Sequence, residues 1–156
     1  MFPLTGLRLL LPALVPSWRF FDAVTASPRV DYVVLGPFEA GPDEADPAWQ
    51  EFRPRPEVVT VATMLRRLLW NPQWNESLFL VSLSERLIHA ATGETALHSQ
   101  RELLLRVARD LHRRGLASPD AFLQIRLRLV GREGERVASA VVYLSAPCAM
   151  EALLTP

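Results

Sequence analysis

The sequence predicts one α+β domain over residues 1–156, in which about three or four helices pack on a small antiparallel sheet that includes a C-terminal hairpin. Two observations predict this class. Apolar residues recur at helical spacing through the middle of the chain, and two segments with strand-like alternation flank a glycine-rich turn near its end. A chain of this length buries roughly two-thirds of its unfolded surface, so a core forms without disulfides or metals.

The N-terminal third is predicted to hold an arm, a strand and a loop. Residues 1–26 form the arm, with a short helix that Ser17 caps and that carries Trp18. Val30 to Leu35 is rich in valine and tyrosine and predicts a strand. Residues 36–47, GPFEAGPDEADP, predict an exposed loop, because glycines, prolines and acids sustain neither a helix nor a strand.

Two helices are predicted in the middle of the chain. The first begins at Thr60 or Thr63 and ends at Asn71-Pro72, because a residue that precedes proline disfavours the helical conformation. Asn75 then caps a long helix that runs to about Ala91. This second helix carries apolar residues around much of its circumference, so we expect it to be central and largely buried.

A third helix has clear boundary signals at both ends. Ser99 and Glu102 match a capping box, in which the two side chains satisfy free backbone N–H groups at a helix start. Gly115 stands where a glycine commonly follows a helix end, behind Arg113 and Arg114. The sequence therefore predicts a helix from Ser99 to about Arg114.

A β-hairpin is predicted after this helix. Phe122 to Val130 and Val137 to Leu144 flank the segment 131–134, GREG. In the first of these strands, leucines and an isoleucine alternate with a glutamine and arginines. That alternation is typical of a strand with one buried and one solvated face.

Composition limits the function classes. The formal net charge is zero, so the chain lacks the long-range field that recruits nucleic acid or anionic lipid. All 17 basic residues are arginine, which we interpret as a coding bias in preference to an arginine-dependent surface. Cys148 is the only cysteine, which favours a reducing, cytoplasmic compartment. No metal-ligand spacing, nucleophile elbow or phosphate-binding loop is found, and we expect no cofactor.

The segment from Trp49 to Trp74 is the main candidate for a binding surface. It holds three of the four tryptophans, interleaved with prolines and arginines. Tryptophan and arginine dominate the energetics of protein interfaces, so the predicted partner is another protein chain. The alternative for the same aromatic residues is packing inside the domain. The predicted contact residues are Trp49, Phe52, Arg53, Arg55, Trp70 and Trp74.

Other functions stay open. Arg106, Arg109 and Arg113 form a stripe at helical spacing, and helices followed by a hairpin is also the order of a winged helix that reads DNA. An enzyme of unreadable class, with a pocket between the long helix and the hairpin, is a further alternative. Leu7 to Val15 is an apolar run that is too short to span a bilayer. Residues 1–18 either pack on the domain or offer a peripheral membrane contact.

Two short motifs resemble a known family. Trp18-Arg19-Phe20-Phe21 followed by Ser27-Pro28-Arg29, and Trp49-x-x-Phe52-x-Pro54-Arg55-Pro56, are similar to motifs of HTTM-type membrane proteins and of the soluble C-terminal region of lipase maturation factors. Their multi-span membrane part has no counterpart in this sequence, and no catalytic residue is carried over. The resemblance implies an accessory protein or subunit that works beside a membrane-associated or enzyme partner.

Overall fold

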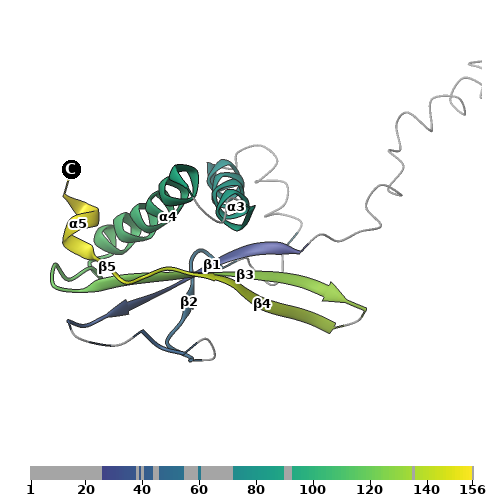
Figure 1. Cartoon of the computed structure of the whole chain (residues 1–156), viewed down its shortest axis with the longest axis horizontal. Helices are drawn as coiled ribbons and strands as arrows, with labels where there is room; N and C mark the ends of the chain where they lie inside the picture. The colour runs from purple at the N-terminus through teal and green to yellow at the C-terminus, as the bar shows by residue number, and fades with distance from the viewer. Residues whose placement is uncertain are drawn as a thin grey trace, which may run out of the picture.

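The computed structural model describes residues 26–37, 39, 41–43, 46–54, 60, 72–89, 93–134 and 136–155, without the side chains of residues 72–74 and 133. Within these residues the α+β class is confirmed (Figure 1). The elements, in chain order, are β1 (Ser27–Leu35), β2 (Gln50–Glu51), α3 (Pro72–His89), α4 (Glu94–Arg113), β3 (Phe122–Glu133), β4 (Arg136–Leu144), β5 (Cys148–Ala149) and α5 (Met150–Leu154).

The sheet is antiparallel and is built around β3. Its strand order is β2-β1-β3-β4, and β5 pairs with the start of β3. β1 pairs with β3 along its whole length, from Ser27 opposite Val130 to Leu35 opposite Phe122. The β3–β4 hairpin confirms the sequence prediction, although its turn is shorter than expected, with Glu133 opposite Arg136.

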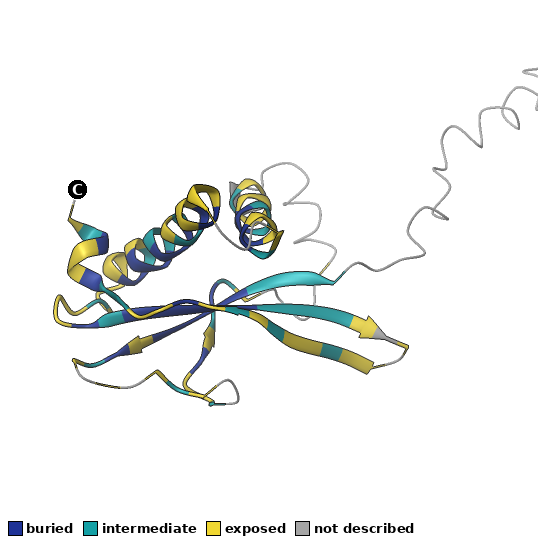
Figure 2. Cartoon of the chain, viewed as in Figure 1, coloured by how far each residue is buried: buried dark blue, intermediate teal, exposed yellow. Residues whose placement is uncertain are grey.

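The main core lies between the sheet and the helices, which cover one face (Figure 1). Leu123, Ile125 and Leu127 alternate along β3 and are fully buried against this layer, as their period-2 spacing predicts. The helices contribute Leu103 and Val107 of α4, which are also fully buried. Figure 2 shows the buried stripe of α4 turned toward the sheet.

The start of α4 corrects the capping-box prediction. The helix begins at Glu94, behind Gly93, so Ser99 lies inside it and is fully buried. Ser99 stands one turn before Leu103 on the same face, and the Ser99 hydroxyl has no hydrogen-bond partner among the residues that the structure describes. The motif was misleading because a serine three residues before a glutamate occurs inside a helix as well as at its N-cap. The spacing alone does not distinguish the two positions.

The end of α4 confirms the glycine prediction. Gly115 has a φ of 69°, a conformation that glycine adopts without steric cost. Gly115 N–H donates to the carbonyl of His112 at 3.0 Å, and Leu116 N–H donates to that of Leu111 at 2.9 Å. These two bonds form a Schellman motif, which satisfies carbonyls that the helix leaves free.

Helix α3 differs from its prediction in two ways. It begins at Pro72 and not at Asn75, so the proline that was expected to follow one helix is the first residue of another. Proline suits this position because backbone N–H groups in the first turn have no acceptor within the helix, so a residue without an N–H loses no hydrogen bond. The helix is also not buried around its circumference: Leu78 and Phe79 are 50% and 41% exposed. One side packs against α4 and β1, and the described residues do not cover the other.

The second face of the sheet is also partly covered, which corrects the prediction of a solvated face. Gln124 and Arg126 are only 6% and 8% exposed. The chain passes around the sheet edge at β2, so that Trp49 joins Val33 and Leu35 on this second face while Phe52 joins the main core. The sequence did not predict β2, β5 or α5, which are too short to produce a periodic signal.

Two predicted elements lie outside the described residues. These are the arm, of which only Ala26 is described, and the helix between Thr60 or Thr63 and Leu69. The described residues of the loop 36–47 form no helix or strand, in agreement with its prediction. Within the part of the chain that the structure describes, no helix is both long enough and apolar enough to cross a membrane.

Candidate functional site

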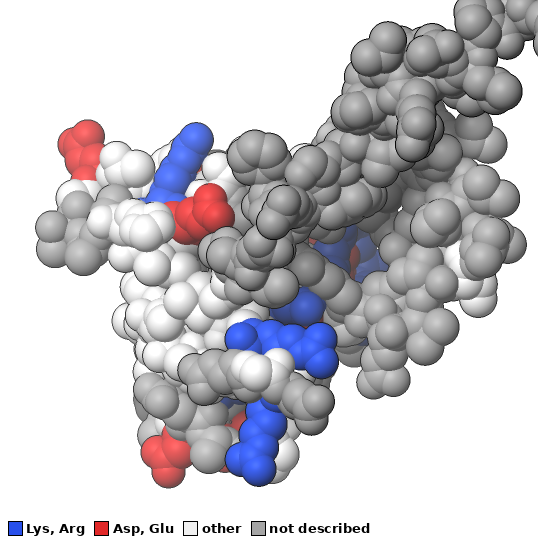
Figure 3. Space-filling view, turned by 90° about the vertical axis from the view of Figure 1, so that its right-hand side faces the viewer, with Lys and Arg blue, Asp and Glu red and all other residues white. Residues whose placement is uncertain are grey.

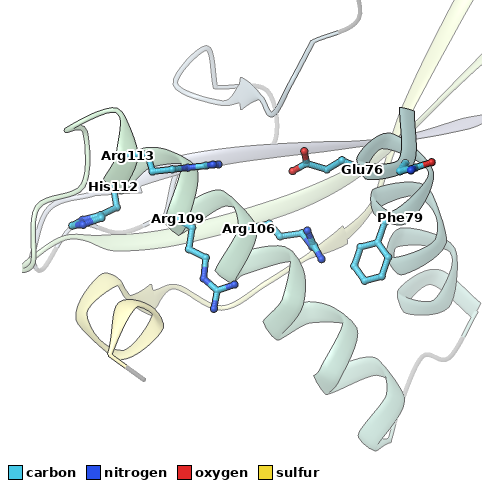
Figure 4. Close-up of a pocket in the computed structure, with 7 residues that line it drawn as sticks. Glu76, Phe79, Arg106, Arg109, His112 and Arg113 are labelled. Atoms are coloured by element: carbon cyan, nitrogen blue, oxygen red, sulfur yellow. The ribbon is translucent and has the colours of Figure 1, made fainter. Parts of the chain in front are cut away.

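A groove of about 640 Å³ lies between the first half of α3 and the second half of α4, and we call it the arginine groove (Figure 4). Helical spacing explains its composition, because residues 106, 109 and 113 of α4 lie on one face. Opposite them, α3 contributes a carboxylate and an exposed phenylalanine. The lining residues are Asn75, Glu76, Phe79, Arg106, Arg109, His112 and Arg113.

Arg106 is held against an aromatic ring. Its guanidinium carbon lies 4.2 Å from the centre of the Phe79 ring, a cation–π contact that orients the side chain across the groove. The nearest carboxylate, that of Glu102, is 4.0 Å away, which is beyond hydrogen-bond distance. The Nε–H of Arg106 has no acceptor in the described part of the chain. This guanidinium therefore keeps unused donors.

The other two arginines of the stripe differ in their pairing. Arg109 is exposed, and no carboxylate among the described residues lies within ion-pair distance of it. Arg113 lies 3.3 Å from Asp110, but 68% of its side chain is exposed. Figure 4 shows that Arg106 and Arg113 extend toward α3, whereas Arg109 extends in another direction. The three side chains thus form a row of donors and do not converge on one point.

Two of the acids around the groove are already paired with arginines. Arg53 forms an ion pair with Glu76 and lies 3.6 Å from Asp110, so it connects the β2 segment to both helices. Asp110 also lies within 3.5 Å of Arg114. Among the described residues the local charge is therefore positive by two, with five arginines (Arg53, Arg106, Arg109, Arg113 and Arg114) against three carboxylates (Glu76, Glu102 and Asp110).

A second candidate surface is the outer edge of β4, which we call the β4 edge. Within the described residues no strand pairs with this side of β4. Val137, Val142 and Leu144 are 74%, 41% and 45% exposed, and the only charged residue of the strand is Arg136 at its start. Figure 2 shows β4 coloured mainly as exposed. The pairing register shifts at Leu127 and Arg128, so the regular part of the edge ends near Val141.

A buried charge cluster lies on the second face of the sheet. Asp31 is 1% exposed and accepts hydrogen bonds from Arg126 at 2.8 Å and from Arg128. The Arg126 guanidinium also lies 4.6 Å from the Trp49 ring centre. The hydrogen bond to Asp31 raises the pKa of Arg128 above its ordinary value, so this arginine stays charged. The cluster joins β1 to β3 and leaves Trp49 little exposed.

The predicted contact residues of the Trp49–Trp74 segment have different positions. Trp49 and Phe52 are 8% and 6% exposed and contribute packing on opposite faces of the sheet. Arg53 is half-buried beside α3 and α4, with a φ of 55° that is uncommon for a residue other than glycine. Arg55 and Trp70 lie outside the described residues, as does the Trp74 side chain. A contact surface made by these three stays a prediction.

The structure does bring the alternative arginine stripe together, since Arg106, Arg109 and Arg113 all line the arginine groove. The partners across the groove, Glu76 and Phe79, were missed by sequence reasoning because they belong to another helix. The three histidines, at positions 89, 98 and 112, are exposed. Among the described residues no group of His, Cys, Asp and Glu side chains is placed to hold a metal ion.

Charges of both signs lie on the face of the molecule seen from the tip of the hairpin (Figure 3). Blue arginine side chains and red carboxylates both occur on the part of that face that the described residues form. A surface that reads a nucleic-acid backbone is expected to be more uniformly basic.

Comparison with known proteins gives no family. No protein-family model matches the chain, and no significant match is found among curated proteins or among solved structures. Its function is therefore inferred from the arrangement of its own residues.

Proposed function

We propose that this chain is a small non-catalytic accessory protein that binds another protein chain through the β4 edge. The single observation that carries this proposal is the nine-residue edge strand with three large exposed apolar side chains and one terminal charge. Natural proteins normally protect such an edge with lysines, prolines or a covering element, because its free N–H and C=O groups accept any other strand.

The chemistry of the edge fits the addition of a partner strand. Strand addition takes its affinity from main-chain hydrogen bonds and its specificity from alternate side chains. Ala138, Ser139 and Ala140 are small and leave space beside the strand for the side chains of an incoming segment. The regular pairing register from Arg136 to Val141 accommodates a partner strand of about six residues, a common strand length.

The partner would be a subunit of a membrane-associated or enzyme complex, as the sequence resemblance implies. Support for the DNA-binding alternative is weaker. Asp110 lies within ion-pair distance of both Arg113 and Arg114, and Glu102 shares the same helix. A phosphate backbone that approached α4 would meet these carboxylates as well as the arginines.

The test is affinity capture of the tagged chain from the cells that naturally contain it, with two matched variants. Val137→Lys combined with Val142→Lys places charges on the β4 edge. Leu97→Lys combined with Leu116→Lys makes the same chemical change at exposed leucines away from it, where 67% and 53% of each residue is accessible. Melting temperatures first establish that both variants fold.

We expect a protein that the wild-type chain and the Leu97/Leu116 variant retain and that the Val137/Val142 variant loses. Equal recovery by both variants, or no partner for the wild-type chain, contradicts the proposal. A duplex-DNA-dependent partner that nuclease treatment releases would favour the regulator alternative instead.

A further inference from the structure

We infer that the arginine groove is a binding site for an acidic protein segment in extended conformation, separate from the β4 edge. The inference rests on charge complementarity. Among the described residues, five arginines surround the groove with three carboxylates, so the positive charges there exceed the negative ones by two. The whole chain has no net charge, so this excess is a local property of the α3–α4 surface.

The unused donors are identifiable. Arg109 has no ion pair within the described residues, and Arg106 approaches its one carboxylate only to 4.0 Å. Arginine presents a planar fork that binds a carboxylate through two parallel hydrogen bonds, and such charge-assisted bonds are about twice as strong as neutral ones. The Phe79 ring fixes the Arg106 guanidinium at 4.2 Å, so little side-chain freedom is lost when a carboxylate binds there.

The shape of the donor row selects an extended ligand. Residues 106 to 113 span about 10 Å of the helix axis at 1.5 Å per residue. An extended peptide rises about 3.3 Å per residue, so roughly three residues cover the same length. A single phosphate ion requires donors that converge, whereas Figure 4 shows Arg109 directed away from the other two arginines. The row therefore fits two Asp or Glu side chains at alternate positions of an extended segment better than one compact anion.

The groove also offers an apolar contact. Phe79 is 41% exposed, and its apolar ring lies at the α3 side of the row of arginines. A nucleic-acid backbone makes no use of such a wall in the absence of stacked bases. An acidic peptide with an apolar residue beside its carboxylates uses both features.

The experiment measures binding of a fluorescently labelled peptide of six glutamates, with a six-glutamine peptide as the uncharged control. Its key variant is Arg106→Gln combined with Arg109→Gln. A matched control, Arg132→Gln combined with Arg136→Gln, removes the same charge from the exposed end of the β3–β4 hairpin. Because the two variants have the same net charge, any difference between them reports on the groove and not on the overall field.

We expect the wild-type chain and the hairpin variant to bind hexaglutamate, and the groove variant to bind it at least about tenfold more weakly. Binding should also fall as the salt concentration rises, since exposed guanidinium groups are screened. The six-glutamine peptide should not bind.

Four outcomes would overturn the inference. The first is no hexaglutamate binding by the wild-type chain, and the second is equal weakening in both variants. The third is competition by millimolar inorganic phosphate, which would make the groove a small-anion site. The fourth is a labelled DNA duplex that binds more tightly than the peptide and depends on Arg106 and Arg109, which would assign the groove to nucleic acid. None of these outcomes tests the β4 edge, because the groove variant leaves that strand unchanged and the hairpin control changes only Arg136 at its start.

Discussion

Asp31 on β1 and Arg126 on β3 stand directly opposite each other in the sheet and are joined by a hydrogen bond of 2.8 Å, although 95 residues separate them in the chain. Both are almost fully buried, with 1% and 9% of the side chain exposed. The attraction between two buried charges offsets the free-energy cost of removing them from water only while both partners are present. The pair therefore makes the register of β1 on β3 highly specific.

Asp31→Asn should destabilise the protein by about 3 kcal/mol, because it removes the carboxylate charge that pairs with the buried Arg126 guanidinium. The free energy of unfolding in urea measures the effect. Glu51→Gln is the control, since Glu51 pairs with Arg29 and Arg128 at a more exposed site and its loss should cost about 1 kcal/mol or less. Similar small losses for the two variants would show that the cluster contributes nothing specific.

Leu103→Ala should cost about 2–5 kcal/mol, since this residue of α4 is fully buried and its removal leaves a cavity between helix and sheet. Leu97→Ala in the same helix is the matched change at a residue that is 67% exposed, and its effect should stay within about 0.5 kcal/mol. Denaturant unfolding of both variants checks the prediction. Comparable values would mean that α4 does not pack on β3 as described.

Ser99→Ala should be neutral or slightly stabilising. The Ser99 hydroxyl is buried and finds no hydrogen-bond partner in the described part of the chain, and alanine is the better helix former. If Ser99 were instead the N-cap that its sequence motif predicts, the same substitution would cost about 1 kcal/mol. Thermal unfolding distinguishes the two, because the sign of the change in melting temperature differs.

Tyr143→Phe should change how stability depends on alkaline pH. Burial raises the pKa of Tyr143 above its ordinary value of 10.0. The unfolded chain releases this proton at the ordinary pKa and the folded chain only at a higher pH, so the stability that Tyr143 contributes is complete below about pH 10 and falls as the pH rises through the raised pKa. The Phe variant lacks this alkaline loss.

At neutral pH the same variant should be less stable by about 1 kcal/mol, because the Tyr143 hydroxyl no longer donates its 2.8 Å hydrogen bond to Gln100. Urea unfolding near pH 7 and about pH 11 should show this gap between the two proteins narrowing. A gap that stays constant or widens contradicts the assignment.

Periodicity and turn chemistry predicted a large part of the fold. The alternation from Phe122 to Val130 and the position of Gly115 are local signals, and both were confirmed because nothing distant overrides them. The start of α4 was wrong because the Ser99 motif cannot report that the helix already extends upstream. The burial of Arg126 could not be predicted from the local sequence either, because it depends on Asp31 and Trp49, which lie far away in the chain.

The candidate sites show the same difference between features of one element and contacts between distant elements. The stripe of Arg106, Arg109 and Arg113 is a property of one helix, so its spacing alone was enough to group the three residues. The neutralisation of Glu76 by Arg53 and the cation–π contact of Phe79 involve a neighbouring helix and the β2 segment. Tertiary packing sets these contacts, and no local pattern in a single sequence encodes them.

The central position of β3 has a consequence for synthesis on the ribosome. β1 emerges first, α3 and α4 follow, and the strand that pairs with the whole length of β1 is translated last of these four. Until Phe122 to Val130 has left the exit tunnel, β1 has no partner along this side and the apolar stripes of both helices have no sheet to cover. Loop closure over this separation is also slow. At that stage the unfinished chain exposes apolar side chains, which chaperones bind, and unpaired backbone, which proteases cleave.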